Sequence, residues 1–220
     1  MSEEDHSTEE PPDVSRKKVK IVIMGPSEAG KTTYLRALDD KAVLMVDKSG
    51  RTVGMDVGFV AVDPHSGEIM RRDEVRGKAG FFGRLLGRER PSPVIVEIQL
   101  VSTPGQERFR WVREALARGV HGAILMVDSS RPDQVGEAGV VYHEIRAILP
   151  EVPVVLVANK QDLEGSLSPQ EVRDLTGLDE LEVFGTSALK GENVEAPLKR
   201  LIQLILGREL DQKANWAAMA

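Results

Sequence analysis

Short apolar runs alternate with amphipathic segments along most of the chain. Runs such as 154–157 contain no polar residue, which is typical of strands that are buried on both faces of a parallel sheet. Strands are predicted at 19–24, 57–62, 94–101, 122–127, 152–158 and 181–184. Helices are predicted at 31–39, 107–118, 132–149, 169–175 and 194–206. This alternation favours βαβ units, and therefore an α/β fold with a mainly parallel sheet.

Glycine-rich and polar motifs follow directly after several of the predicted strands. In open α/β sheets, ligands bind outside the carboxyl ends of the strands. Motifs that each follow a strand therefore meet at one edge of the sheet. The sequence predicts one ligand site at this edge, built from the segments 25–33, 102–107, 159–162 and 186–189.

The first motif, residues 25–32, matches G-x-x-x-x-G-K-[ST], the phosphate-binding loop. Its glycines allow consecutive backbone N–H groups to turn inward, and the following helix adds its positive N-terminus, so the loop can bind an anion. Lys31 is expected to reach the β- and γ-phosphates, and the Thr32 hydroxyl to bind Mg²⁺. The residues expected to surround the phosphates are Gly25, Ser27, Glu28, Ala29, Gly30, Lys31, Thr32 and Thr33.

The second motif, Asn159-Lys160-Gln161-Asp162, indicates which base is bound. The Asp162 carboxylate is only an acceptor, and guanine offers it two adjacent donors, N1–H and N2–H₂. Adenine presents an acceptor at that edge and would be repelled, so the motif disfavours a P-loop kinase or ATPase. We expect Asn159 and Lys160 to join this loop to the phosphate-binding loop and to cover the ring.

Two further segments complete the predicted site. In the segment 102–107, Gly105 is expected to present its backbone N–H to a γ-phosphate, and Gln106 to orient the attacking water. In the segment 186–189, a backbone N–H near Ala188 is expected to contact guanine O6. The residues expected to bind the base there are Ser187, Ala188 and Leu189.

Together these motifs resemble those of the small Ras-like GTPases, and the resemblance covers residues 19–207. The segments 29–33 and 159–163 are similar to Arf-type proteins, whereas 103–106 resembles the prokaryotic gliding and polarity GTPases of the MglA type. The resemblance implies a three-layer P-loop GTPase fold, with a mostly parallel six-stranded sheet, one antiparallel edge strand and helices on both faces. It also implies GTP and GDP as ligands, Mg²⁺ as cofactor, and slow GTP hydrolysis that an activator accelerates.

The same resemblance implies two switch segments, 42–56 and 102–118, where an activator, an exchange factor and an effector would bind. Order gained from contacts with the γ-phosphate, and lost on hydrolysis, is how such segments signal. Thr52 matches the switch threonine of the family. The residues implied in catalysis are Gln106, Lys31 and Thr52, and those implied in Mg²⁺ binding are Thr32 and Thr52.

Three features depart from the family pattern. Ser102 stands where the family has an aspartate that steadies Mg²⁺, and serine carries no charge. Glu28 places a carboxylate inside the phosphate-binding loop, where it would repel phosphate unless it points outward. Residues 64–93 form an insert where family members have a tight turn. Ser102 and Glu28 leave an alternative open, which is a nucleotide-bound scaffold with little intrinsic hydrolysis.

Composition and charge narrow the setting of the protein. The 220 residues, 41% of them hydrophobic, are enough for one domain with a sizeable core. The chain has no cysteine, which excludes disulfides, cysteine-bound zinc and prenyl or palmitoyl anchors. The net charge of −6 comes from the first 14 residues, which hold six acidic side chains and no lysine or arginine, so no nucleic-acid partner is expected. The expected organisation is a disordered acidic tail at 1–18, a GTPase domain at 19–207 and a C-terminal tail at 208–220.

The insert carries a strong local charge. Residues 70–90 contain seven basic and three acidic side chains, and on a short helix Phe81, Phe82, Leu85 and Leu86 would share one face. A basic amphipathic segment can bind an anionic membrane or a partner groove, or it can pack onto its own domain. Because the strand that follows leads into the site, the insert is expected at the opposite end of the sheet. We therefore expect a cytoplasmic protein that can bind peripherally at the inner face of a membrane.

Overall fold

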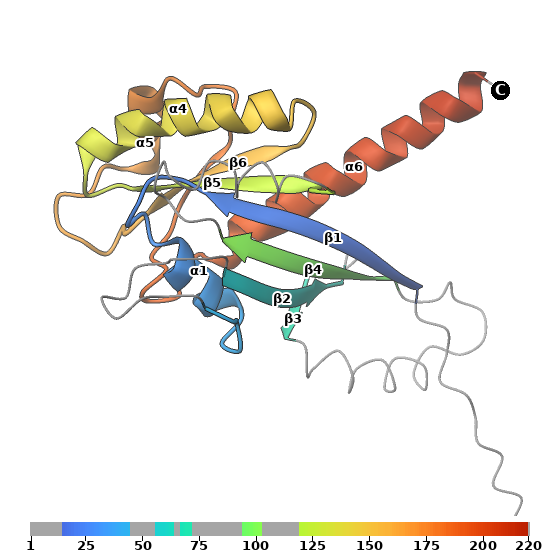
Figure 1. Ribbon diagram of the computed structural model, residues 1–220, viewed down its shortest axis with the longest axis horizontal. Helices are drawn as coiled ribbons and strands as arrows, with labels where there is room; N and C mark the ends of the chain where they lie inside the picture. The colour runs from blue at the N-terminus through green and yellow to red at the C-terminus, as the bar shows by residue number, and fades with distance from the viewer. Residues whose placement is uncertain (1–14, 45–55, 64–66, 72–93, 103–118, 220) are drawn as a thin grey trace, which may run out of the picture.

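The computed structural model describes residues 15–44, 56–63, 67–71, 94–102 and 119–219. These residues form one sheet with helices on both of its faces (Figure 1). The strands are β1 (Ser15–Met24), β2 (Asp56–Val62), β3 (Ile69–Arg71), β4 (Val94–Ser102), β5 (Gly122–Asp128), β6 (Val154–Asn159) and β7 (Val183–Gly185). The helices are α1 (Lys31–Leu38), α4 (Pro132–Ile148), α5 (Pro169–Thr176) and α6 (Glu195–Met219). The three-layer α/β fold predicted from the sequence is confirmed.

The strands lie in the order β3-β2-β4-β1-β5-β6-β7. Strands β4, β1, β5, β6 and β7 are parallel, whereas β2 is antiparallel to both of its neighbours. The sequence predicted six strands, and the seventh is β3, which lies inside the predicted insert 64–93. Three residues are too few to show a periodic pattern. Strand β3 forms because the chain turns back after β2 and pairs Ile69 with Val62.

Two hydrophobic clusters cover the two faces of the sheet. Along β1, Ile21 and Ile23 belong to one cluster while Val22 and Met24 belong to the other, because successive side chains of a strand point to opposite faces. Helices α1 and α6 pack on the first cluster, and α4 and α5 pack on the second. Burial on both faces explains the continuous apolar runs of the sequence.

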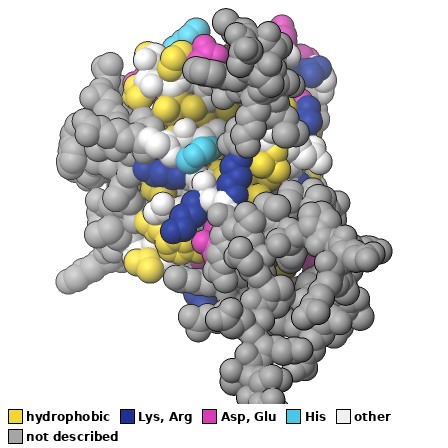
Figure 2. Space-filling model, turned by 90° about the vertical axis from the view of Figure 1, so that its right-hand side faces the viewer, with side chains coloured by type: hydrophobic (Ala, Val, Ile, Leu, Met, Phe, Trp, Pro, Cys, Tyr) yellow, Lys and Arg dark blue, Asp and Glu magenta, His cyan; other side chains and the backbone are white. Residues whose placement is uncertain are grey.

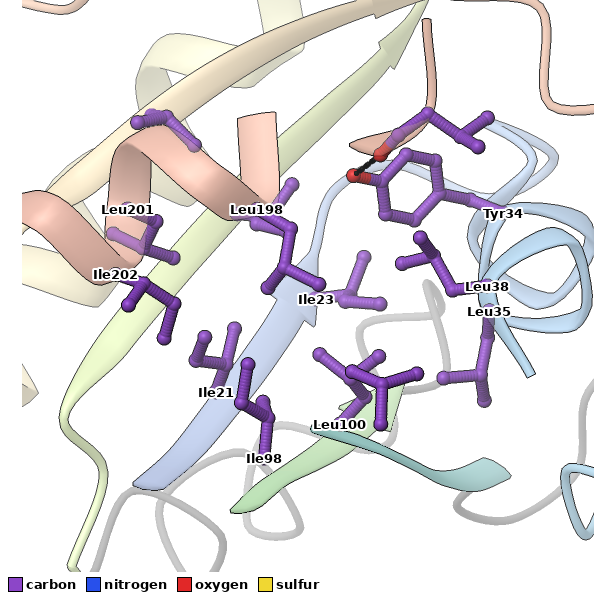
Figure 3. Close-up of a cluster of buried hydrophobic side chains, with 14 of the residues drawn as sticks. Ile21, Ile23, Tyr34, Leu35, Leu38, Ile98, Leu100, Leu198, Leu201 and Ile202 are labelled. Atoms are coloured by element: carbon purple, nitrogen blue, oxygen red, sulfur yellow. Dashed lines mark hydrogen bonds between the residues drawn. The ribbon is translucent and has the colours of Figure 1, made fainter. Parts of the chain in front are cut away.

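A buried tyrosine joins α1 to the start of α6 (Figure 3). Tyr34 is fully buried, and its hydroxyl donates a hydrogen bond to the Val194 carbonyl at 2.6 Å. Burial raises the pKa of Tyr34, so the hydroxyl stays protonated and remains a donor. Leu198 of α6 and Ile23 of β1 belong to the same cluster. This packing holds α1, whose first turn forms part of the candidate site.

Regular secondary structure reaches into both of the predicted tails. Strand β1 begins at Ser15, inside the predicted tail 1–18, because residues 15–18 pair with residues 94–97 of β4. Helix α6 continues to Met219, through the predicted tail 208–220, and its carboxyl end projects beyond the sheet (Figure 1). Within the described parts of the chain, no helix is both long enough and apolar enough to cross a membrane.

The end of the sheet opposite the motifs carries basic side chains. Burial, followed by the charges of Lys17 and Lys20, lowers the pKa of His121 at this end. Figure 2 shows a histidine among lysine and arginine side chains on the same end of the molecule. The turn after β2 also lies here, and it is closed by a hydrogen bond from the Gly67 N–H to the Asp63 carbonyl at 2.8 Å. The insert therefore starts at the end that the strand directions predict, and its residues 72–93 lie outside the described residues.

Candidate functional site

Four connections meet at the carboxyl edge of the parallel strands (Figure 1). Strand β1 leads into α1, β5 into α4, β6 into the segment 159–162, and β7 into the segment 186–189. Strands β1, β5, β6 and β7 are consecutive in the sheet, so their loops are neighbours. A ligand bound at this edge would contact residues that are far apart in the sequence.

The loop between β1 and α1 has the backbone of an anion-binding nest. Glu28 and Gly30 have positive φ angles of 64° and 94°, and they flank Ala29. Left-handed residues that alternate with ordinary ones turn successive N–H groups toward one point. Gly30 is the N-cap of α1, and no described side chain caps the helix, so the positive end of the helix faces the loop. This loop therefore fits a phosphate group.

Two glycines allow the loop to lie close to the strands behind it. A Cβ atom at Gly25 would lie 2.0 Å from the Met126 carbonyl oxygen, and the φ angle there is 147°. A Cβ atom at Gly30 would lie 2.2 Å from Asn159 Nδ2. Only glycine fits at these two positions. The spacing of the glycines therefore follows from packing as well as from ligand binding.

Lys31 and Thr32 lie in the first turn of α1. Lys31 Nζ donates to the carbonyl oxygens of Gly25 at 3.0 Å and Pro26 at 2.6 Å, and the residue is only 6% exposed. The ammonium group is thus held over the loop. Thr32 Oγ1 donates to Asp56 Oδ2 at 2.5 Å. A hydroxyl that donates its proton keeps its lone pairs, so Thr32 can still bind a hard cation such as Mg²⁺.

Glu28 extends toward α4. Its carboxylate lies 3.6 Å from the Arg131 guanidinium, which precedes α4. Both side chains are about half exposed, so the pair adds little stability. The Gln134 amide, with its nitrogen turned toward the loop, donates to the Ser27 carbonyl at 3.2 Å. The outward direction and the cation partner of Glu28 reduce the repulsion of phosphate that the sequence predicted.

Asn159 connects three segments of the site. Its Nδ2 donates to the Ala29 carbonyl of the phosphate-binding loop at 2.9 Å. Its Oδ1 accepts from the Ala188 N–H at 3.0 Å and from the Thr186 hydroxyl at 3.1 Å. Asn159 is 2% exposed, so these bonds are formed away from water. The side chain therefore sets the position of the 159–162 loop against both neighbouring segments.

Lys160 and Gln161 are held by residues that follow β5. Lys160 has a positive φ of 68°, and its Nζ pairs with Asp128 Oδ2 at 2.5 Å. Gln161 Nε2 donates to Ser129 Oγ at 2.9 Å, and Ser129 Oγ donates to the Asn159 carbonyl at 2.5 Å. Asp128 and Ser129 are buried. They stabilise the turn that brings Asp162 to the edge.

Asp162 lies beside the segment that follows β7. Its Oδ1 accepts a hydrogen bond from Ser187 Oγ at 2.6 Å, and this bond lowers the pKa of Asp162. The carboxylate is therefore ionised at neutral pH, as recognition of two adjacent donors requires. The sequence predicts that a backbone N–H near Ala188 contacts guanine O6, and the N–H of Ala188 itself donates to Asn159 Oδ1 in this structure. Leu189 is 78% exposed.

Several residues of the predicted site lie outside the described residues. These are Thr52, Gly105 and Gln106, together with most of the two predicted switch segments, 42–56 and 102–118. Their roles remain predictions. The remaining predicted residues lie on the loops at the carboxyl edge, with Thr33 exposed on α1.

The structure adds four residues that sequence reasoning did not single out: Asp56, Asp128, Ser129 and Arg131. Asp128 ends β5 and Ser129 follows it. The rule that found the other motifs, a polar residue at the end of a buried strand, applies to these two residues as well and could have found them. Asp56 begins an antiparallel strand, so the same rule misses it. Arg131 shows no pattern in the sequence.

Comparison with known proteins identifies the family. The family model described as "Ras family" matches residues 92–207. The Ras-related protein Rab-27B of Bos taurus is 30% identical over 195 residues, which cover 86% of this chain and 80% of the relative. The chain belongs to the Ras family. The Ras-related protein Rab-4B of Rattus norvegicus is 34% identical over 192 residues, covering 86% and 76% of the two chains.

A second group of relatives is similar to this chain over a shorter range. The ADP-ribosylation factor-like protein 4D of Bos taurus is 32% identical over 128 residues, which cover 54% of this chain and 64% of that protein. The predicted membership of the small Ras-like GTPases is thus confirmed, and the chain is a small GTP-binding protein. The resemblance of residues 103–106 to the MglA type remains a prediction.

Proposed function

We propose that this Ras-family protein hydrolyses GTP to GDP and acts as a molecular switch that recruits partners in its GTP state. The observation that supports this most strongly is the bond from Asn159 Nδ2 to the Ala29 carbonyl. It joins the predicted base-binding loop to the predicted phosphate-binding loop. A ligand that carries both a base and phosphates would span the two loops.

The base would be recognised by the second loop. Asp162 is ionised and would accept from guanine N1–H and N2–H₂, while Ser187 orients the carboxylate through its hydroxyl. Lys160 would cover one face of the ring with its aliphatic stem, because its ammonium group is held by Asp128. An adenine ring would place an acceptor against Asp162, which favours guanine.

The phosphates would lie against the first loop and the N-terminus of α1. Lys31 would exchange its bonds to the Gly25 and Pro26 carbonyls for phosphate oxygens, since an ammonium group pairs more strongly with an anion. The Thr32 hydroxyl would be the Mg²⁺ ligand from this loop. Mg²⁺, when bound, neutralises charge that develops on the phosphate oxygens.

Hydrolysis would proceed by in-line attack of water on the γ-phosphate. Gln106 would orient the water, and the Gly105 N–H and Thr52 would contact the γ-phosphate side of the site. Backbone N–H groups and Lys31 would stabilise the developing negative charge. We expect slow intrinsic turnover, with an activator, an exchange factor and an effector binding at 42–56 and 102–118.

One observation favours the alternative of a nucleotide-bound scaffold with little hydrolysis. Position 102, where P-loop NTPases carry an acidic residue near Mg²⁺, is a serine. The second argument for a scaffold is the Glu28 carboxylate in the phosphate-binding loop. It is weaker, because Glu28 lies beside the Arg131 guanidinium. Turnover separates the two functions, since a scaffold would bind GTP without cleaving it.

The test is single-turnover phosphate release from protein loaded with GTP and Mg²⁺. Gln106→Leu should slow release by about 10²-fold or more, since a positioned proton-handling or water-orienting group contributes at least that much. Its affinity for GDP should not change. Gln170→Leu is the matched control, because Gln170 lies on α5 and its side chain bonds to Asp174 and Arg173 of the same helix. Phosphate release by Gln106→Leu at the wild-type rate would refute the mechanism. A wild type that binds GTP but releases no phosphate, alone and with its activator, would support the scaffold.

A further inference from the structure

The end of β4 lacks a charge that a Mg²⁺ site uses. In P-loop NTPases, Mg²⁺ is held by the serine or threonine of the loop and by an aspartate at the end of a nearby strand. Ser102 occupies that strand end here. Its Oγ is buried and has no hydrogen-bond partner among the described residues. An unsatisfied buried hydroxyl costs stability, and it therefore suggests that a polar group is missing beside it.

A carboxylate lies directly opposite this serine. Asp56 pairs with Ser102 across the antiparallel strands β2 and β4. Paired residues of an antiparallel sheet point to the same face, with Cβ atoms about 4.5–5.5 Å apart. This face carries Leu100 and Ile23, and it is the face that α1 covers. Asp56 and Ser102 therefore point toward the helix that carries Thr32.

Asp56 already contacts the residue that would bind the metal. Its Oδ2 accepts from Thr32 Oγ1 at 2.5 Å, and its side chain is fully buried. Carboxylates that accept a hydrogen bond from a metal ligand orient that ligand and raise its affinity for the cation. Mg²⁺ also prefers hard, anionic oxygen atoms. The contact thus has the form that a Mg²⁺ site requires.

A second aspartate, at the C-cap of α1, shows what a purely structural carboxylate looks like in this fold. Asp39, at the other end of the helix, accepts from the backbone N–H groups of Phe59 at 2.8 Å and Lys41 at 3.0 Å. These bonds fasten the carboxyl end of α1 to β2, far from the phosphate-binding loop. Asp56 instead bonds to the side-chain hydroxyl of Thr32, at the edge where the phosphates would lie.

We propose that Asp56 supplies the carboxylate of the Mg²⁺ site, in place of an aspartate at position 102. The inference rests on the proposed function, because the cation would be bound together with the nucleotide. Moving the negative charge from β4 to the paired position on β2 keeps it on the same face of the sheet. The site then retains its charge although its usual strand end carries serine.

The test measures how Mg²⁺ slows the release of fluorescent mant-GDP from the full-length protein. In Asp56→Asn, which keeps the shape and an acceptor oxygen for Thr32, the Mg²⁺ concentration that gives half the slowing should rise about 10–100-fold. Release in EDTA is measured for each variant and serves as that variant's own Mg²⁺-free baseline. The double variant Asp56→Asn/Ser102→Asp should return toward the wild-type Mg²⁺ concentration. Asp39→Asn is the matched control and should behave as the wild type.

Three results would overturn the inference. The first is that mant-GDP release from Asp56→Asn depends on Mg²⁺ as it does in the wild type. The second is that Asp39→Asn shifts this dependence as far as Asp56→Asn does. A wild type that binds no mant-GDP would overturn the proposed function as well, and it is a distinct result.

Ser102→Asp gives a test that does not depend on the folding of Asp56→Asn. Two carboxylates at paired positions repel each other, so this variant should melt below the wild type in EDTA and recover with Mg²⁺ and GDP. If Ser102→Asp melts in EDTA at the same temperature as the wild type, the two side chains do not share a site, and the proposal is overturned.

Discussion

Replacing Asn159 by alanine should destabilise the protein and separate the two loops of the site. The substitution removes an amide that is 2% exposed. It leaves the Ala29 carbonyl and the Ala188 N–H without their side-chain partner, and both residues are buried. Each buried polar group left unpaired costs about 1–3 kcal/mol, so the variant should lose about 2–6 kcal/mol of its free energy of unfolding. Domains of this kind have about 5–15 kcal/mol in total, so the loss is large.

Thr186→Val is the matched control for this prediction. It removes the hydroxyl that donates to Asn159 Oδ1 at 3.1 Å but leaves both backbone contacts of the amide in place. We expect it to lose about 1 kcal/mol. The assay is urea denaturation in EDTA, followed by far-UV circular dichroism and extrapolated linearly to water. If Asn159→Ala loses no more than Thr186→Val, the amide does not hold the loops together and the reasoning is refuted.

Three further predictions concern the base, the pH and the insert. Asp162→Asn should weaken GDP binding and admit xanthosine diphosphate, whose C2 carbonyl accepts from the new amide. A variant that binds GDP as tightly as the wild type does would contradict this. The Ser187 hydroxyl lowers the pKa of Asp162, so the wild type should keep its affinity for GDP as the pH falls below the ordinary pKa of an aspartate. Ser187→Ala should lose affinity for GDP at a higher pH than the wild type does. Fluorescence titration of GDP binding across acidic buffers measures both. The basic insert should carry the protein into pellets with anionic liposomes at low salt, and Phe81→Ser/Phe82→Ser should stay in the supernatant.

The sequence predicts the parts of the fold that depend on local patterns. Long apolar runs such as β5 and β6 are recognisable because both faces of these strands are buried. Strand β3 is missed because three residues form a strand only through pairing with β2. The extension of α6 beyond residue 206 is missed because the segment that follows is polar and begins with Gly207, which resembles a tail.

The site divides in a similar way. Lys31, Thr32, Asn159 and Asp162 are found because their motifs require particular residues at set spacings. The partners that hold them are contributed by other elements, such as Asp128 for Lys160, and only the packing of the strands brings them together. Asp56 is the clearest case, because nothing in its local sequence shows that β2 places it opposite Ser102.

The most direct test of the account is competition between GDP and ADP for the mant-GDP site of the wild-type protein. A site built to hydrogen-bond particular donors rejects an analogue without them by about 10⁴-fold or more, so ADP should displace mant-GDP only at concentrations higher by about that factor. In Asp162→Ala, most of this difference between the displacing concentrations of GDP and ADP should disappear. Displacement by GDP and ADP at equal concentrations would contradict the claim that the loops at the carboxyl edge form a guanine-nucleotide site.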